Sequence, residues 1–369
     1  MTRFWLGGYG SAMEGSADGI GLLAGDADRQ TALEYRGAVT QTPSPSWLAQ
    51  HPTLDVVYAA LEGDAAVQAF SRSGESVLRP LGEPVEAGEN VCHVAVSPSG
   101  GYLVASCYGD GRVVRIGIAP DGGLVADAAN RAAELRAALL GETLETSAPA
   151  GVAAAASDPY PGEHTASGDE RESHAHSAVF LADGRIATTD LGFDLVRIWR
   201  PTAGGLILDH EIVLPLGTGP RHMVAHPSGH LHVVTEYSCE VFTLAASRDG
   251  TWAVVSAVLS SPIAEVGVDF PAELVRSRDG QFLYTALRGS NTIAALRVRG
   301  GGESLESIAL ADSGVDWPRH HLVHEGKLLV AGQRSDSIAL LDLDERTGAP
   351  LGIRHTAQVP TPTHFLPVR

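Results

Sequence analysis

A pattern of about 45 residues recurs along the chain, and it constrains the fold more than any other feature of the sequence. Each copy has an alternating apolar stretch, a turn such as Ser-Pro-Ser-Gly-Gly, and a second apolar stretch. Six copies begin at residues 45, 91, 175, 220, 271 and 318, and a seventh is divided between residues 362–368 and 3–10. With residue 362 as the last start, successive starts lie 46, 84, 45, 51, 47 and 44 residues apart, so one period carries an insertion. A period of this length is typical of propellers and other repeat architectures.

The strands within one copy predict how the repeats assemble. The two apolar stretches form an antiparallel pair, a third strand such as residues 111–118 follows, and the residues before the next copy supply a fourth. Four antiparallel strands, repeated seven times, predict an all-β, seven-bladed β-propeller. The N-terminal TRFWLGG and the C-terminal THFLPV are expected to pair and close the last blade, whereas a stacked solenoid would carry distinct capping repeats. We therefore predict a single domain over residues 1–369.

The composition fits this architecture and narrows the class of partner. The chain has 42 Gly, 21 Pro and only 6% aromatic residues, as an all-β protein with many turns requires. The formal net charge of −18 disfavours nucleic acid and anionic membranes as partners, because both need clustered Lys and Arg. The N-terminus lacks a long apolar region with a cleavage site, and no run of eighteen apolar residues occurs, so we expect a cytoplasmic protein with a small-molecule partner.

No cofactor signature accompanies the repeats. No glycine-rich phosphate loop joins a strand to a helix and no GxSxG elbow is present, which disfavours NAD, ATP and serine hydrolase chemistry. The three cysteines, Cys92, Cys107 and Cys239, have neither CxxC spacing nor an even number, so we interpret them as small apolar fillers without a disulfide. We expect no cofactor.

The insertion covers residues from about 128 to 172. A stretch of helical character at residues 128–142 precedes a segment rich in Ala, Gly, Ser and Pro. Such a composition is common in mobile surface loops. The alternative is a lid, which we favour because the insertion leads directly to His174 and His176 at the start of a repeat. A strand pair hidden in the insertion would change the blade count.

Two sets of equivalent positions place chemically different side chains at one end of the channel. The first ring is the residue that follows each repeat start, and the second ring is the residue that ends each second strand. The start of one strand and the end of its antiparallel neighbour share an edge of the sheet, so the two rings should meet. The first ring is Ser46, Cys92, His176, Arg221, Ala272, Arg319 and Thr363. The second ring is Tyr9, Glu62, Tyr108, Asp190, Glu236, Arg288 and Gln333.

Three neighbouring repeats concentrate ionisable residues in these rings. The group is His176, Asp190, Arg221, Glu236 and Arg288. A charge-balanced channel mouth would explain any one of them, since ion pairs between arginine and carboxylate are common. Taken together, they indicate a site for an anionic or oxyanion-forming ligand, because the planar arginine side chain donates two parallel hydrogen bonds to a carboxylate or phosphate.

The other histidines point less clearly to function. His93, His222 and His320 each follow a first-ring residue, and strand alternation predicts that they point away from its side chains, as residues that pack or form hydrogen bonds between blades. His164 and His174, with His176, suggest a metal only weakly, because the nearby arginines disfavour a cation. We predict no metal site.

Four segments, taken in order, carry a resemblance to a known family. They are CHVAVSPSGGYLVASCYGDGRV, HAHSAVFLADGRIATTDLG, GPRHMVAHPSGHLHVVTEYS and AELVRSRDGQFLYTALRGSNTIA. Over nearly its full length the chain resembles the seven-bladed propeller lactonases, which include the propeller type of 6-phosphogluconolactonase and the 3-carboxy-cis,cis-muconate cyclases. This resemblance implies His176, Arg221, Glu236 and Arg288 as active-site residues. The chain has Thr235 and Leu287 where the family usually has Asn, so the substrate can differ.

The expected activity is the metal-independent hydrolysis of a sugar-acid lactone such as 6-phosphogluconolactone. Nearby arginines should lower the pKa of Glu236, so His176 is the preferred general base, and Arg221 or Arg288 should stabilise the oxyanion. The residues expected to bind the substrate are Glu62, Tyr108, Asp190, Arg319 and Gln333. Two alternatives stay open, a lyase that opens or closes a muconolactone and a propeller that binds a ligand or protein without catalysis.

Overall fold

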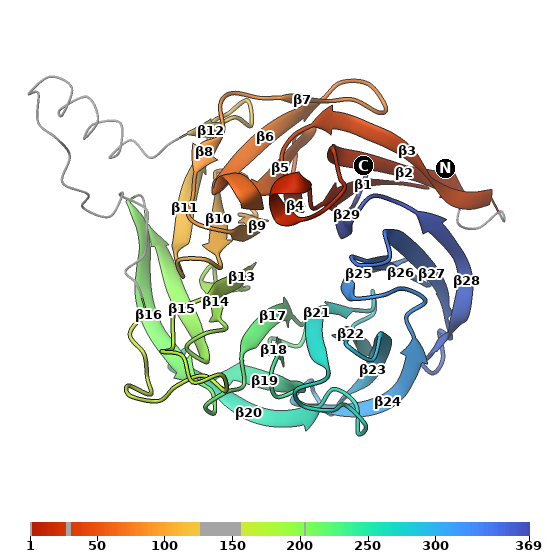
Figure 1. Cartoon of the computed structure of the whole chain (residues 1–369). Coiled ribbons are helices and arrows are strands. Elements are labelled where there is room, and N and C mark those ends of the chain that lie inside the picture. The colour runs from red at the N-terminus through yellow and green to blue at the C-terminus, as the bar shows by residue number, and fades with distance from the viewer. Residues whose placement is uncertain (1, 27–30, 126–155, 203) are drawn as a thin grey trace, which may run out of the picture.

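The strands form seven antiparallel sheets around a central channel (Figure 1). The computed structural model describes residues 2–26, 31–125, 156–202 and 204–369. The prediction of an all-β, seven-bladed propeller is confirmed. The helix expected at residues 128–142, and with it most of the insertion, lies outside the described residues. Among the described residues, no helix has the length and apolar character needed to cross a membrane.

Each blade begins with the strand nearest the channel and continues outward. Blade 1 contains β4 (Pro45–Gln50), β5 (Val56–Leu61), β6 (Ala66–Arg72), β7 (Leu78–Pro80) and β8 (Val85–Glu86), which pairs with β6. Blade 2 contains β9 (Val91–Val96), β10 (Tyr102–Cys107), β11 (Val113–Ile118) and β12 (Leu124–Val125). Blade 3 contains β13 (Ala175–Phe180), β14 (Ile186–Asp190), β15 (Leu195–Thr202) and β16 (Gly205–Val213). Blade 4 contains β17 (Pro220–Ala225), β18 (Leu231–Thr235), β19 (Glu240–Ala246) and β20 (Trp252–Leu259).

The remaining three blades complete the circle. Blade 5 contains β21 (Phe270–Arg276), β22 (Phe282–Arg288), β23 (Thr292–Arg299) and β24 (Ser304–Asp312). Blade 6 contains β25 (Pro318–His324), β26 (Lys327–Gly332), β27 (Ser337–Leu343) and β28 (Pro350–Gln358). Blade 7 contains β29 (Pro362–Pro367), β1 (Thr2–Gly8), β2 (Gly19–Asp26) and β3 (Thr31–Gln41). Two 3-10 turns, η1 (Ser11–Met13) and η2 (Glu62–Asp64), follow β1 and β5.

Both ends of the chain lie in blade 7, as the sequence predicts. Strand β1 pairs antiparallel with β29, with Phe4 opposite Pro367 and Leu6 opposite Phe365. Beyond the ladder, the amide of Tyr9 donates to the carbonyl of Thr361 over 3.1 Å. The first strand of the chain is therefore held by the last, and blade 7 closes the ring.

The hydrophobic core is divided among the interfaces between blades. Seven clusters of buried apolar side chains are present in the described residues, and each joins two neighbouring blades. One cluster packs Trp5 of blade 7 against Leu48 and Phe70 of blade 1. A blade has two faces to cover and no helices to cover them, so its strands alternate apolar residues toward both neighbours.

A β-bulge interrupts the innermost strand of every blade at the position of the first ring. Pro45 pairs with Leu61 and Trp47 pairs with Ala60, so that Ser46 is one residue more than its partner strand supplies. The same shift between paired residues recurs in β9, β13, β17, β21, β25 and β29. Because a bulge sets two residues against one and turns a side chain from its regular direction, a first-ring residue and its successor can both face the channel.

The residues that follow the first ring meet at the channel axis. The indole of Trp47 lies between 4.1 and 5.5 Å, centroid to centroid, from the imidazoles of four other blades. These imidazoles belong to His93, His222, His320 and His364. Glu273 of blade 5 joins this axial cluster through a 3.0 Å contact with the Nε2 atom of His320. The bulge places His93, His222 and His320 at the channel axis, where they contact side chains of other blades. The amide of Leu274 in blade 5 donates to Nδ1 of His222 over 3.5 Å, and the amide of Phe365 in blade 7 donates to Nδ1 of His320 over 3.3 Å. These contacts agree with the predicted role in packing or hydrogen bonding between blades.

The axial histidines are buried and uncharged. Burial and the neighbouring histidines lower the pKa of His93 to about 3. Burial also lowers the pKa of His222 to about 3, although the carboxylate of Glu273 opposes this shift. Burial raises the pKa of Glu273 against the pull of His222 and His321. The centre of the ring is thus a packed aromatic layer that excludes charge.

We predict that the folded protein loses stability as the pH falls below about 6.5, the ordinary pKa of histidine. The unfolded chain then binds protons that buried His93 and His222 exclude, so each site lowers the free energy of unfolding by up to about 1.4 kcal/mol per pH unit. Urea unfolding between about pH 8 and pH 4.5 should show this decline. The double variant His93→Gln/His222→Gln should give a shallower slope, whereas His164→Gln/His230→Gln should not. An equal slope in the axial variant and the wild type would contradict the assignment.

Candidate active site

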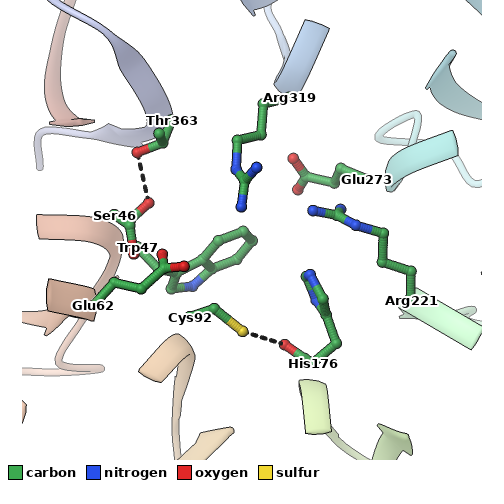
Figure 2. Close-up of a pocket in the computed structure, with 9 residues that line it drawn as sticks. All are labelled: Ser46, Trp47, Glu62, Cys92, His176, Arg221, Glu273, Arg319 and Thr363. Atoms are coloured by element: carbon green, nitrogen blue, oxygen red, sulfur yellow. Dashed lines mark hydrogen bonds between the residues drawn. The ribbon is translucent and has the colours of Figure 1, made fainter. Parts of the chain in front are cut away.

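The two predicted rings meet around a pocket of about 20 Å³ at the channel (Figure 2). The first ring contributes all of its members except Ala272, the second ring contributes Glu62, and the axial cluster contributes Trp47 and Glu273. The lining residues are Ser46, Trp47, Glu62, Cys92, His176, Arg221, Glu273, Arg319 and Thr363. The volume is close to that of a single water molecule, so a larger ligand must extend beyond this pocket.

One carboxylate joins two arginines beside the pocket. The Oε2 atom of Glu236 lies 2.8 Å from Nε of Arg221 and 2.8 Å from Nη2 of Arg288. Arg221 follows the start of β17, Glu236 follows β18, and Arg288 ends β22, so two adjacent blades build this cluster. The Nε atom of Arg288 also donates to the carbonyl of Phe270 over 2.9 Å, and its guanidinium lies over Trp317. These contacts hold the guanidinium groups of Arg221 and Arg288 in place.

A second group of ring residues surrounds Arg319 on the side of the pocket formed by blades 6, 7 and 1. Arg319 donates from Nη1 to Oε1 of Gln333 over 3.2 Å, and its guanidinium lies 4.9 Å from the ring centroid of Tyr9. The hydroxyl of Tyr9 in turn donates to Oε1 of Glu62 over 3.1 Å. Figure 2 shows Arg319 and Arg221 extending into the same space, Arg319 from the top of the view and Arg221 from the right. Gln333 is therefore a partner of Arg319 and not a lining residue.

His176 enters the pocket from blade 3. Its imidazole points into the space beside Arg221 in Figure 2, and its Nδ1 atom is buried without a hydrogen-bond partner. The phenol ring of Tyr108 stands edge-on to His176 at 6.2 Å and stacks on His174 at 4.4 Å. Tyr108, at the rim of the pocket, therefore has its edge toward His176 and its ring face against His174.

Asp190 has a different environment from the one the sequence suggests. Its side chain is fully buried, and Oδ2 lies 2.8 Å from Nη2 of Arg197. Its Oδ1 atom accepts the backbone amides of His174 and Phe193 over 2.9 and 3.1 Å. Both oxygens are occupied by protein groups, so the geometry does not support the predicted contact of Asp190 with a substrate. The residue instead holds the chain that enters blade 3.

Burial and the nearby arginines shift the pKa values of the ionisable residues of the site. Burial alone would raise the pKa of Glu236, but Arg288 and Arg221 outweigh it, and the pKa is lowered. Burial raises the pKa of Glu62 even though Arg319 opposes the shift. Burial, with Arg221 and Arg319, lowers the pKa of His176 well below its ordinary value. The arginines therefore outweigh burial at Glu236, whereas burial outweighs Arg319 at Glu62.

Sequence reasoning missed Trp47 and Glu273 as lining residues. Both directly follow a first-ring position, where the seven repeats have Trp47, His93, Ser177, His222, Glu273, His320 and His364. Four histidines and a glutamate are an unusual choice for packing between apolar blades, and this composition was the available signal. In the described part of the chain, no three His, Cys, Asp or Glu side chains are placed to hold a metal ion.

Comparison with known proteins agrees with the whole architecture. The model of a family described as lactonase, seven-bladed β-propeller, matches residues 3–367. A 6-phosphogluconolactonase of Bacillus subtilis is 24% identical over 98% of this chain and 97% of its own length. The crystal structure of a periplasmic gluconolactonase of Pseudomonas aeruginosa aligns with a TM-score of 0.82 and 21% identity, over 100% of this chain and 99% of that one. A structure from Lactobacillus plantarum aligns with a TM-score of 0.81 and 24% identity, over 99% and 100%.

The arginine pair predicts a specific response to the loss of Glu236. The variant Glu236→Gln leaves two buried guanidinium groups without their counter-charge, which should lower stability by on the order of 3 kcal/mol. Inorganic phosphate should restore much of this loss, because the anion replaces the missing carboxylate. Thermal unfolding with and without phosphate measures both effects.

The exposed pair of Arg299 and Glu306 provides the matched control. Glu306→Gln should change stability by less than about 0.5 kcal/mol and should gain nothing from phosphate beyond the wild type. An equal gain in both variants would show that the arginine pair is not an anion site.

Proposed function

The chain belongs to the lactonase family of seven-bladed β-propellers, and we propose that it hydrolyses a small anionic sugar-acid lactone of the 6-phosphogluconolactone type. The resemblance seen in the sequence and the enzyme class of lactonase are confirmed at the level of the family. The observation that carries the choice of substrate is the gathering of three arginines at and beside the pocket. Arg221, Arg288 and Arg319 suit a substrate that carries one negative group and develops a second during reaction.

In the proposed reaction, water adds to the lactone carbonyl and the ring C–O bond then breaks. His176 is proposed to accept the proton from water, because its imidazole points into the pocket and its buried Nδ1 atom has no hydrogen-bond partner. Glu236 suits this role less well, since Oε2 is shared by two arginines. The ring oxygen leaves with a proton, and the product is a hydroxy acid.

We assign different roles to the three arginines according to whether they line the pocket. Arg221 lines the pocket with His176, so we assign it, helped by Arg319, to the oxyanion that forms on the carbonyl oxygen. Arg288 lies outside the lining and is assigned to the substrate's phosphate or carboxylate. Glu236 is a positioning residue that orients Arg221 and Arg288. Glu62 and the rim residue Tyr108 are assigned to substrate hydroxyl groups.

Removal of Arg288 should impair the phosphorylated substrate most. Wild-type protein should hydrolyse 6-phosphogluconolactone well above its spontaneous rate, and Arg288→Ala should lower kcat/KM by roughly a hundredfold or more. Unphosphorylated gluconolactone should be affected far less, because it lacks the group that Arg288 binds. A pH-stat assay corrected for the background rate measures all four combinations.

Arg334 is the matched control, since its guanidinium also lies over Trp317, at 3.5 Å, but it is outside the arginine pair. Arg334→Ala should keep kcat/KM within about threefold of the wild type. No acceleration of either lactone would contradict the proposed substrate. Activity on a muconolactone alone would favour the lyase alternative.

The lowered pKa of His176 predicts an unusual pH profile. A general base must be unprotonated, so activity should not fall as the pH drops through 6.5, where an ordinary histidine loses its base form. kcat/KM measured between about pH 7.5 and pH 5.5 should therefore stay nearly flat. His176→Gln should lower kcat by at least about a hundredfold, and His174→Gln should lower it by less than tenfold. A half-loss of wild-type activity near pH 6.5 would contradict this role.

A further inference from the structure

A second and much larger cavity lies beside the arginine pair. It has a volume of about 550 Å³, within the range of sites that bind small organic molecules. Its walls come from the described end of the insertion, from the segment after β14, from the β16–β17 loop, from Tyr237 and from Val266, Gly267 and Phe270. We call this space the side cleft, and none of its lining residues is shared with the central pocket.

A buried ion pair fixes the insertion side of the cleft. The Nη2 atom of Arg171 lies 3.0 Å from Oδ2 of Asp194, and both side chains are 3% exposed. Arg171 also donates to the carbonyl of Gly192 over 2.9 Å. A Cβ at residue 192 would collide with the carbonyl oxygen of Glu172, so glycine there allows the insertion to pass directly over blade 3. These contacts hold the described end of the insertion against blade 3, where it forms one wall of the cleft.

The interior of the cleft is mainly apolar and carries no net charge. Leu191, Leu216, Val266 and Phe270 line it. Its two charged lining residues are Arg171 and Asp194, and they neutralise each other. Exposed fractions of 44% for Leu216 and 64% for Val266 leave apolar surface open to a ligand.

Two lining residues join the cleft to the arginine pair. Tyr237 lines the cleft and directly follows Glu236. Phe270 lines the cleft, pairs with Arg288 across β21 and β22, and accepts the 2.9 Å hydrogen bond from Nε of Arg288. A molecule bound in the cleft therefore lies against two residues, Tyr237 and Phe270, that are direct neighbours of Glu236 and Arg288.

We propose that the side cleft binds an apolar alkyl or aryl substituent of an anionic ligand whose carboxylate or phosphate is held by Arg288. The central pocket holds little more than one water molecule, so the body of any substrate must lie beyond it, and the cleft has sufficient size and is lined by Tyr237 and Phe270, the neighbours of Glu236 and Arg288. As a statement about substrates this rests on the proposed function, and it extends the substrate class to lactones with an apolar substituent. As a statement about binding it stands alone.

The binding test compares two carboxylates that differ only in alkyl length. Isothermal titration should give at least tenfold tighter binding for octanoate than for butanoate, because each buried methylene strengthens binding by about threefold to fourfold. The double variant Leu216→Gln/Val266→Asn places amides in the apolar lining and should abolish most of this preference.

Ile263 and Val268 give a matched control on the same surface. They are 74% and 48% exposed and do not line the cleft. Ile263→Gln/Val268→Asn makes the same kind of change and should keep the octanoate preference within twofold. Equal affinity for both carboxylates, no binding of either at millimolar concentration, or an equal loss in both double variants would overturn the proposal.

The lactone assay separates this inference from the proposed function. Octanoate should inhibit the hydrolysis of 6-phosphogluconolactone by the wild type at a concentration at least tenfold lower than butanoate does, and the cleft variant should remove the difference. Hydrolysis of gluconolactones without an octanoate preference would overturn the cleft and leave the lactonase proposal standing. An octanoate preference without hydrolysis of any lactone would support the cleft and overturn the lactonase proposal.

Discussion

The β-bulge in the innermost strand of each blade is the constraint on which both the site and the channel depend. In a regular strand only every second side chain could reach the axis. The extra residue lets two successive positions do so, one at the mouth and one below it. The upper position carries Arg221, Arg319 and His176, and the lower one carries Trp47 and the axial histidines. Seven copies of one local irregularity therefore produce two chemically distinct layers.

The lower layer explains how the upper one can hold so much positive charge. Trp47 and the neutral imidazoles close the channel, so the arginines above them lie over a packed floor and not over an open water column. Low surrounding polarity strengthens the attraction of Arg221 and Arg288 for Glu236. The same surroundings would strengthen their attraction for an oxyanion. The packing of the axis and the electrostatics of the pocket are thus parts of one arrangement.

The sequence predicted what depends on regular periodicity and failed where geometry is irregular or partners are distant. The repeat spacing is enough to predict seven blades, because strand pairing within a repeat is local. It also predicts the pairing of β1 with β29, because the two terminal fragments together supply the strands of one repeat. The same positions predict that Arg221, Glu236 and Arg288 converge, since they sit at equivalent sheet edges. Alternation predicted that His93, His222 and His320 serve in contacts between blades, but not that they meet at the channel axis, because a bulge shifts the phase of a strand by one residue. Asp190 was misjudged because its partner Arg197 lies on the neighbouring strand of its own blade, and the ring pattern contains no information about that residue.

The insertion gains a structural meaning from its described end. Arg171 and Asp194 tie this end to blade 3, so the segment forms one wall of a cavity before the chain enters β13 and reaches His176. The ring side chains already differ from blade to blade, and Arg221 and Arg288 with Glu236 lie on blades 4 and 5. A single insertion between blades 2 and 3 adds a wall on the same side of the channel. Recognition of a polar head and an apolar substituent by one protein follows from this arrangement, because the ring supplies the charges and the cleft beside the insertion supplies the apolar side chains of Leu191, Leu216, Val266 and Phe270.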